Sequence, residues 1–283
     1  MDAIEIIQYG PDDDATCTIL SDEAGWNQTA ADWDMMLRIG WAPGLRAADG
    51  TPLASALAMA MEGDIGWISM VLVTPSKRRQ GIAQHLVGLC IAWLEERGLV
   101  PVLDATPAGQ PLYARMGFTP ICGLKRLAGN AGALGDGSMP NGLPDVLRDI
   151  TIDDIPWIAG FERPAFGAGR EAVLRNLLSR PGAVALADGE NGFVLSRQGS
   201  NATQIDPIVA HNEASALMMM QGALARITGP VLIDALDAQP AIAAQLEIRG
   251  FKVERTFMRM AKGLTRPFGD PSKQFAIAGP ELG

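Results

Sequence analysis

The sequence predicts an α/β protein made of two tandem copies of one domain, each with a central mixed β-sheet flanked by helices. Its 283 residues are about twice the roughly 150 expected of one domain. Residues 103–118 (LDATPAGQPLYARMGF) match residues 236–251 (LDAQPAIAAQLEIRGF) at seven of sixteen positions without a gap. A glycine-rich stretch separates the two segments. A repeat with such a spacer favours a duplicated domain over a single large one.

The first copy alternates helical and strand patterns. Helical spacing of apolar residues predicts helices at 12–20, 30–39 and 82–97, and a short one at 112–116. Apolar, β-branched runs predict strands at 53–61, 65–73 and 100–103, and a last strand begins at Gly117. A helix between the strands at 65–73 and 100–103 is the connection that parallel strands require.

Composition shifts give the boundaries of the copies. We expect an N-terminal domain at 1–128, a linker at 129–142 with glycine at five positions and Pro140, a second domain at 143–263 and a tail at 264–283. The tail is apolar from Phe275 onward, so we expect it to dock on its own or a neighbouring subunit.

Charge and composition exclude several classes of protein. With 48% hydrophobic residues the chain is too apolar to stay unfolded, and a net charge of −9 opposes binding to a phosphate backbone. The longest apolar run, 65–73, is about half the ~20 residues that span a bilayer. The acidic N-terminus lacks the features of a secretory signal. Three widely spaced cysteines favour neither disulfides nor a metal site. We therefore expect a cytoplasmic protein with no metal and no nucleic-acid partner.

The segment most informative about chemistry is a basic turn before a helix. Lys77, Arg78 and Arg79 precede Gly81 and Ala83, whose small side chains leave the first backbone amides of the helix open. Such a helix start binds phosphate. The spacing fits neither a dinucleotide GxGxxG nor a P-loop. The alternative is a basic turn without a ligand.

Residues 78–83 (RRQGIA) resemble the coenzyme A loop of the GNAT acyltransferase superfamily, Gln/Arg-x-x-Gly-x-Gly/Ala, at every defined position. Residues 112–118 (LYARMGF) are similar to the late helix and LY-x-x-x-GF element of that family. The layout of the chain, with AFGAGR at 165–170 and RM at 259–260, is similar to tandem bacterial GNAT proteins.

The resemblance implies an acyltransferase fold in which acetyl-CoA lies between two splayed strands. The implied ligands of coenzyme A are Val71, Leu72, Val73, Arg78, Arg79, Gln80, Gly81, Ile82 and Ala83. A strand N–H near Leu72 or Val73 would be the oxyanion donor. Tyr113 matches the residue that protonates the leaving thiolate. The alternative for Tyr113 is core packing.

A base and an acceptor site are harder to assign. The acids near the two splayed strands are Glu62, Asp64 and Asp104. Asp104 recurs in the second copy as Asp237, so a structural cap of the following turn is at least an equal alternative to a base, and water is another candidate to take the proton. Trp26 and Trp33 lie where the family places its acceptor helices, with core packing as the alternative.

The second copy lacks the residues for this chemistry. No glycine or arginine occurs at 210–214, and the overlay places Leu246 opposite Tyr113. The sequence thus predicts an N-acetyltransferase in which the first copy transfers an acetyl or short acyl group from acetyl-CoA to an amine. The alternative functions are a CoA-responsive binding protein without catalysis and a purely structural tandem. A homodimer stays open.

Overall fold

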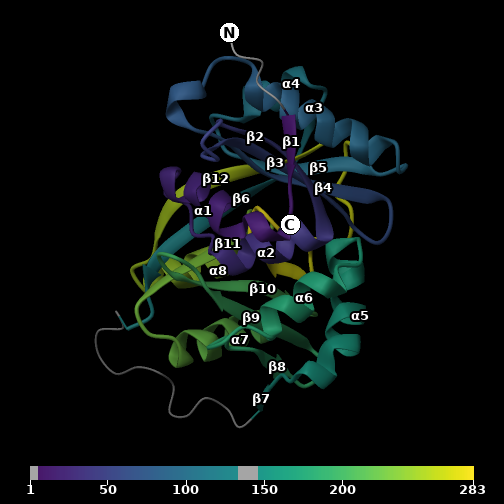
Figure 1. Cartoon of the computed structure of the whole chain (residues 1–283). Coiled ribbons are helices and arrows are strands. Elements are labelled where there is room, and N and C mark those ends of the chain that lie inside the picture. Colours follow the sequence, from purple (N-terminus) through teal and green to yellow (C-terminus); the bar gives the residue numbers. More distant parts are fainter. Residues whose placement is uncertain (1–5, 133–145) are drawn as a thin grey trace.

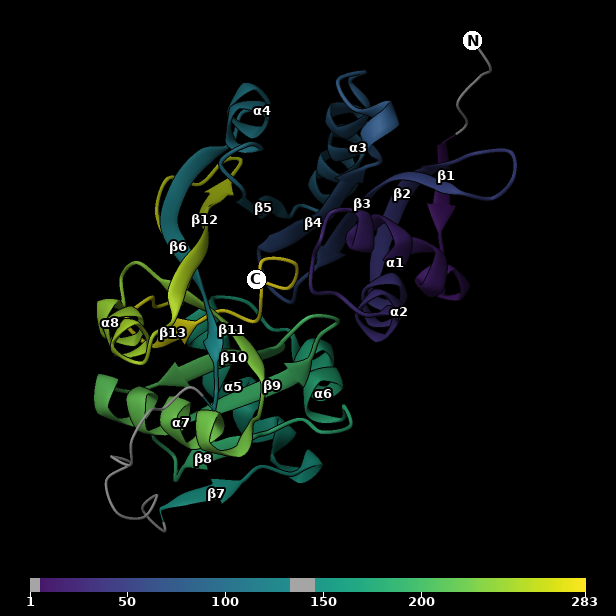
Figure 2. The ribbon, with the colours of Figure 1, turned by 90° about the vertical axis from the view of Figure 1, so that its left-hand side faces the viewer.

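The computed structural model describes residues 6–132 and 146–283, and its central feature is one continuous sheet. The sheet has 13 strands in the order β1-β2-β3-β4-β5-β12-β6-β11-β13-β10-β9-β8-β7. Figures 1 and 2 show the two halves of the chain at opposite ends of this sheet, each with its own helices. The predicted α/β architecture with mixed sheets flanked by helices is confirmed.

The first half contains the following elements: strands β1 (Ile6–Tyr9), β2 (Gly40–Arg46), β3 (Pro52–Ala60), β4 (Ile65–Val73), β5 (Val100–Ala105) and β6 (Thr119–Asn130), and helices α1 (Asp14–Glu23), α2 (Ala30–Ile39), α3 (Ile82–Glu95) and α4 (Gln110–Arg115). The predicted helices and strands are present with small shifts at their ends. The strands β1 and β2 were not predicted, because β1 is short and β2 contains Pro43 and Gly44, which usually interrupt strands. Gly44 is required there, since a Cβ would lie 2.0 Å from the ring of Tyr9.

The second half contains these elements: strands β7 (Leu147–Asp149), β8 (Leu186–Asp188), β9 (Gly192–Gln198), β10 (Thr203–Ala210), β11 (Pro230–Leu236), β12 (Lys252–Ala261) and β13 (Gln274–Ala276), and helices α5 (Ile155–Phe166), α6 (Glu171–Leu178), α7 (Glu213–Arg226) and α8 (Pro240–Ile248). Alternate residues of the strands face opposite sides of the sheet. Leu57 and Met59 pack in the core with α1 and α2, whereas Ala56 and Ala58 pack in the core with α3. The core of α1 and α2 also includes α5 and α6, so it joins the halves.

The two halves exchange their long last strands. β12, from the second half, pairs antiparallel with β5 of the first, and β6, from the first half, pairs antiparallel with β11 of the second. β6 and β12 also pair with each other along most of their length. The predicted linker therefore begins too early, because Gly129 and Asn130 belong to β6. Gly129 is required by packing rather than flexibility, since a Cβ would lie 2.4 Å from the ring of Phe251. Residues 133–142 of that linker lie outside the described residues.

The central parallel strands of the first half pair over a short length and then separate. β4 pairs with β5 only at Ile65, Gly66 and Trp67, opposite residues 100–102. A register shift between β3 and β4 follows, and Met70 has a left-handed φ of 48°. The result is a wedge-shaped gap between β4 and β5 in which strand backbone groups have no ladder partner.

The same gap in the second half is filled by the end of the chain. β10 and β11 pair in parallel only at Thr203 and Gln204. Beyond that point β13 lies between them, with Ala276 opposite both Ile208 of β10 and Ala235 of β11. The predicted docking of the tail on its own chain is confirmed. Among the described residues, no helix combines the length and the apolarity needed to cross a bilayer.

Candidate functional site

The turn after β4 leads into a helix whose first amides are open. Gly81 is the N-cap of α3, with φ of 80° and no side chain that caps the helix. Only glycine adopts this conformation without strain. In the described part of the chain, the amides of residues 81–84 have no hydrogen-bond partner, and a Cβ on Gly81 would meet nothing within 4 Å. Arg78 closes the turn, because its Nε donates to the carbonyl oxygen of Val73 at 3.0 Å. The helix end is an open anion site.

This helix end and the free edge of β4 line one groove of about 1010 Å³. The groove brings together all but one of the residues predicted to bind coenzyme A: Val71, Leu72, Val73, Arg78, Arg79, Gly81, Ile82 and Ala83. Lys77 lines it too. The exception is Gln80, which lines a separate hollow beside His85. A positive helix end above an unpaired strand edge fits a long ligand with a phosphate group and an amide-bearing arm.

An inner cavity continues from this groove between β4 and β5. The two share Trp26, Val71, Thr106 and Arg255 in their walls. Tyr113 of α4 lines the inner cavity together with Met70 and Leu103. Each half of the chain contributes to its walls, since Arg255 and Phe257 come from β12.

Tyr113 is buried, and its ring meets the edge of Phe118 at 6.0 Å between centroids. Burial, with a smaller contribution from Cys90, raises the pKa of Tyr113 to about 12. The hydroxyl has no hydrogen-bond partner among the described residues. It is therefore a protonated phenol throughout the physiological range, which is the state needed to donate a proton.

The two tyrosines of the chain give a direct test of this environment. Burial also raises the pKa of Tyr9, whose hydroxyl donates to the carbonyl oxygen of Leu45 at 2.7 Å. We expect a spectrophotometric titration of the folded protein to show no tyrosinate absorbance at pH 10, whereas the tyrosines of the urea-unfolded chain titrate near their ordinary pKa of about 10. Because only the unfolded chain releases these protons near pH 10, stability should fall as the pH rises from 10 toward 12. A tyrosine that titrates near pH 10 in the folded Tyr9→Phe variant would contradict the burial of Tyr113.

Asp104 lies on β5 in a buried ion pair with Arg259 of β12. Both carboxylate oxygens accept from the guanidinium at 2.9 Å. Burial raises the pKa of Asp104, and Arg259 lowers it. Because Arg259 holds both oxygens, the Asp104 carboxylate links the two halves. This favours a structural role for Asp104 over a role as the base.

The tryptophans separate into two environments. Trp33 is fully buried in the core, and its Nε1 donates to the hydroxyl of Ser21 at 3.1 Å. Trp26 is half-buried and lines the inner cavity and the groove. Trp26 therefore lines a cavity, whereas Trp33 packs in the core, which was the alternative to an acceptor role.

The second half keeps the framework and lacks the open site. α7 begins at Glu213, directly after β10 ends at Ala210, and the side chain of Asn212 caps it by accepting from the N–H of Ser215 at 3.0 Å. Leu246 is the counterpart of Tyr113, as predicted, because its carbonyl oxygen accepts from the N–H of Phe251 just as that of Tyr113 accepts from Phe118, both at 3.0 Å.

The alignment of the two copies without a gap is displaced by three residues at the strand that carries Asp104. Asp104 corresponds to Asp234 on β11, not to Asp237. Asp234 binds Arg126 of β6 through two contacts of 2.8 and 2.7 Å, which mirrors the pair of Asp104 and Arg259. An insertion before α8 shifts the register of the two copies.

Some residues of the inner cavity were not predicted. Gln28, Arg255, Phe257, Pro280 and Glu281 line it although they come from a loop, an exchanged strand and the tail. The only sequence signal was the apolar tail, because none of these residues lies in a motif of the first copy.

Comparison with solved structures agrees with this fold. A putative acetyltransferase from Pyrococcus horikoshii superposes with a TM-score of 0.84 at 18% identity and covers 100% of this chain and 97% of its own. A tandem GNAT protein from the clavulanic acid biosynthesis pathway superposes with a TM-score of 0.64 at 14% identity, covering 91% of this chain and 98% of its own. At these identities the likeness is one of fold.

Sequence comparison adds the family. The holothin acyltransferase of Pseudoalteromonas sp. (strain SANK 73390) is 26% identical over 238 residues, which cover 82% of this chain and 78% of that protein. Residues 15–118 match the model of the acetyltransferase (GNAT) family, and residues 158–276 match that of an acetyltransferase (GNAT) domain. With two matches that cover most of the chain and a tandem fold around an open cleft, the chain belongs to the GNAT acyltransferases, as a member with two tandem GNAT domains.

Proposed function

We propose that the protein is an N-acetyltransferase that transfers an acetyl or other short acyl group from acetyl-CoA to a primary amine of a small molecule or peptide, by direct attack in a ternary complex. The observation that carries the proposal is the continuity of the groove with the inner cavity. An open helix end lies at one end of this space, and Tyr113 lies at the other.

In this proposal the pyrophosphate of coenzyme A lies on the amides of residues 79–83, where Lys77 and Arg79 add positive charge. The pantetheine arm pairs with the free edge of β4 at residues 71–73. The fit is supported by the missing cap on α3 and by the strand edge without a partner.

The chemistry then needs three contributions from the chain. A main-chain N–H near Leu72 or Val73 donates to the carbonyl oxygen of the thioester as negative charge grows there. The amine nitrogen bonds to the carbonyl carbon, the carbon–sulfur bond breaks, and the sulfur takes the proton of the Tyr113 hydroxyl. One proton of the attacking nitrogen passes to solvent, which also reprotonates Tyr113. Asp104 has no part in proton transfer here.

The second half has a supporting role in this proposal. β13 occupies the gap of its sheet and its helix α7 is capped, so we expect one coenzyme A site per chain. One relative is named a holothin acyltransferase, which supports acyl transfer as the reaction. The three cysteines are free thiols, in keeping with a cytoplasmic setting.

Calorimetric titration of acetyl-CoA into wild type and Gly81→Glu tests the coenzyme A site. We expect one site of micromolar affinity in wild type and no binding up to ~1 mM in the variant, because the new carboxylate lies where the pyrophosphate binds. Gly50→Glu is the matched control, since Gly50 also has a left-handed φ, of 90°, and open space around it.

The outcomes separate the proposal from its alternatives. If wild type does not bind acetyl-CoA, or if Gly50→Glu abolishes binding as well, the assigned site is wrong. If acetyl-CoA binds but no amine of a broad panel causes release of the coenzyme A thiol, the protein is a CoA-responsive binding protein instead.

A further inference from the structure

The inner cavity contains two buried polar side chains that nothing in the described chain satisfies. Gln28 is 4% exposed and Ser69 is 7% exposed, and both line the cavity. The Gln28 Oε1 and the Ser69 Oγ are inaccessible and have no hydrogen-bond partner among the described residues. Because an unpaired buried polar atom costs about 1–3 kcal/mol, such a pair in a cavity wall points to a ligand that supplies hydrogen bonds.

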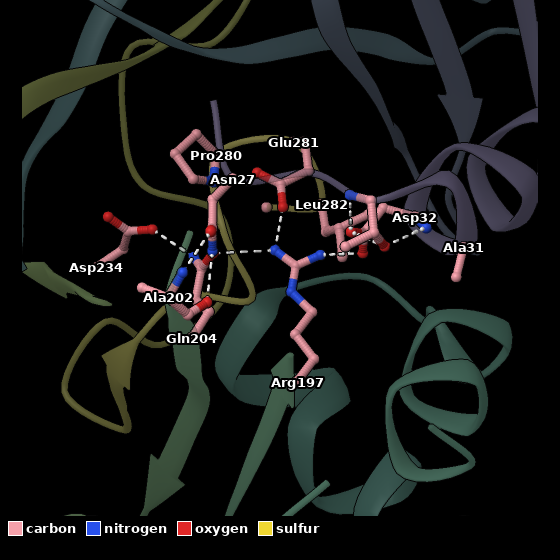
Figure 3. Close-up of polar contacts among 12 residues, drawn as sticks. Asn27, Ala31, Asp32, Arg197, Ala202, Gln204, Asp234, Pro280, Glu281 and Leu282 are labelled. Carbon is pink, nitrogen blue, oxygen red and sulfur yellow. Dashed lines mark hydrogen bonds and ion pairs between the residues drawn. The ribbon is translucent and has the colours of Figure 1, made fainter. Parts of the chain in front are cut away.

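A carboxylate from the last residues of the chain faces the same cavity. Glu281 is buried, and its Oε1 accepts from Arg197. Figure 3 shows the other carboxylate oxygen directed away from Arg197. That oxygen has no partner within the described ranges, whereas both oxygens of Asp104 are held by Arg259. Glu281 is thus the carboxylate of this cavity with an oxygen to spare.

Contacts with both halves of the chain hold Glu281 rigidly. Arg197 is itself fixed by Asp32 at 2.6 Å and by Gln204 at 3.2 Å. The carbonyl oxygen of Pro280 accepts from the Nε1 of Trp67 at 3.0 Å, which ties the tail to β4 of the first half. The residues that precede this part of the tail are held in the sheet as β13. A side chain fixed this firmly is suited to ligand recognition.

We propose that Glu281, Gln28 and Ser69 bind the amino nitrogen of the acceptor, so that the residues after β13 help to define the substrate as a primary amine. An alkylammonium has three N–H donors, and the three oxygens are acceptors. A hydroxyl has one donor and cannot serve three acceptors. This inference rests on the proposed function for its location, and it concerns binding of the nitrogen, which loses one proton to solvent before attack.

Among the charged side chains that line the inner cavity, Glu281 is the one suited to bind an ammonium group. The charge of Arg126 in the cavity wall is matched by Asp234, and that of Asp104 by Arg259. Arg255 is half exposed and also lines the outer groove, where a phosphate-bearing ligand is proposed to lie. Because Arg255 lines both spaces, it lies where the inner cavity opens into the groove.

The test compares an amine with its isosteric alcohol. 2-Phenylethylamine and 2-phenylethanol are titrated calorimetrically into the full chain, with and without saturating CoA; the phenyl group suits the walls at Trp26 and Phe257. We expect the amine to bind wild type about 10-fold or more tightly than the alcohol, and this ratio to fall to within about threefold in Glu281→Gln. Glu190→Gln, at an exposed turn, is the matched control and should retain the wild-type ratio.

Ser69→Ala supplies a second variant that does not depend on Glu281. Removing this unpaired buried hydroxyl loses no hydrogen bond and relieves its burial cost, so the melting temperature should stay the same or rise, while amine affinity falls about threefold or more. A structural role would do the opposite and lower the melting temperature with affinity intact.

Equal binding of the two probes, failure of both to bind, or a ratio unchanged in Glu281→Gln would overturn the inference. The CoA titration separates this result from the proposed function. If CoA does not bind but the protein still prefers the amine in its absence, the proposed binding site for the amino nitrogen is supported and the proposed acyl transfer is contradicted.

Discussion

Replacing Tyr113 by phenylalanine is expected to lower kcat by about 10²–10⁴-fold, the usual contribution of a positioned general acid. The hydroxyl lies in the wall of the inner cavity and is protonated because burial raises its pKa to about 12. It has no hydrogen-bond partner in the described chain, so its removal should leave both stability and acetyl-CoA affinity unchanged. The rate is measured as thiol release with the best amine found in a panel.

Tyr9→Phe is the control for the loss of a buried tyrosine hydroxyl. It removes the hydrogen bond to Leu45 and should cost about 1 kcal/mol of stability with kcat unchanged. If Tyr113→Phe lowers kcat by less than about threefold, solvent protonates the leaving thiolate and Tyr113 serves only to pack the core.

Replacing Arg259 by methionine is expected to reduce the free energy of unfolding by about 3–5 kcal/mol, because it leaves the Asp104 carboxylate buried without its partner. Arg259 is buried and also stacks over the ring of Trp67 at 4.8 Å. Urea denaturation followed by fluorescence measures the change.

The pH dependence of this variant has a definite sign. Without Arg259, burial and, to a smaller extent, the carboxylates of Asp234 and Glu281 hold the pKa of Asp104 above its value in the unfolded chain. The folded variant then binds the proton more tightly than the unfolded chain, so its stability is greatest at acidic pH and falls as the pH rises through the raised pKa. The difference from wild type should be smaller at pH 5 than at pH 8.

Two further variants test the cause. Adding Asp104→Leu to Arg259→Met should restore much of the lost stability, because no unpaired charge is left. Arg175→Met, which breaks an exposed pair with Glu171, should have no measurable effect. If the double variant is as unstable as the single one, lost packing and not the unpaired charge is responsible.

The sequence was sufficient where structure is local. α2 begins as predicted because Thr29 and Asp32 form a capping box, and β4 ends just before Pro75. The basic turn at Gly81 has an open helix end because a left-handed glycine can begin a helix without a capping side chain. Patterns of a few residues determine each of these features.

The rest depends on contacts between distant parts of the chain. Arg259 meets Asp104 across 155 positions of sequence, and Arg197 meets Glu281 across 84. Single-sequence patterns do not reveal which strands will be exchanged. The same limit applies to the inner cavity, whose walls combine a loop before α2 with β12 and the tail.

The exchange of β6 and β12 has a consequence for how the molecule can lose its structure. Each half would lack an interior strand of its own sheet if it were produced alone, and that sheet would expose unpaired edges prone to aggregation. Neither half can melt without removing a strand from the other. The exchange has therefore joined two folding units into a single cooperative one, in which damage to either half is transmitted directly to the other.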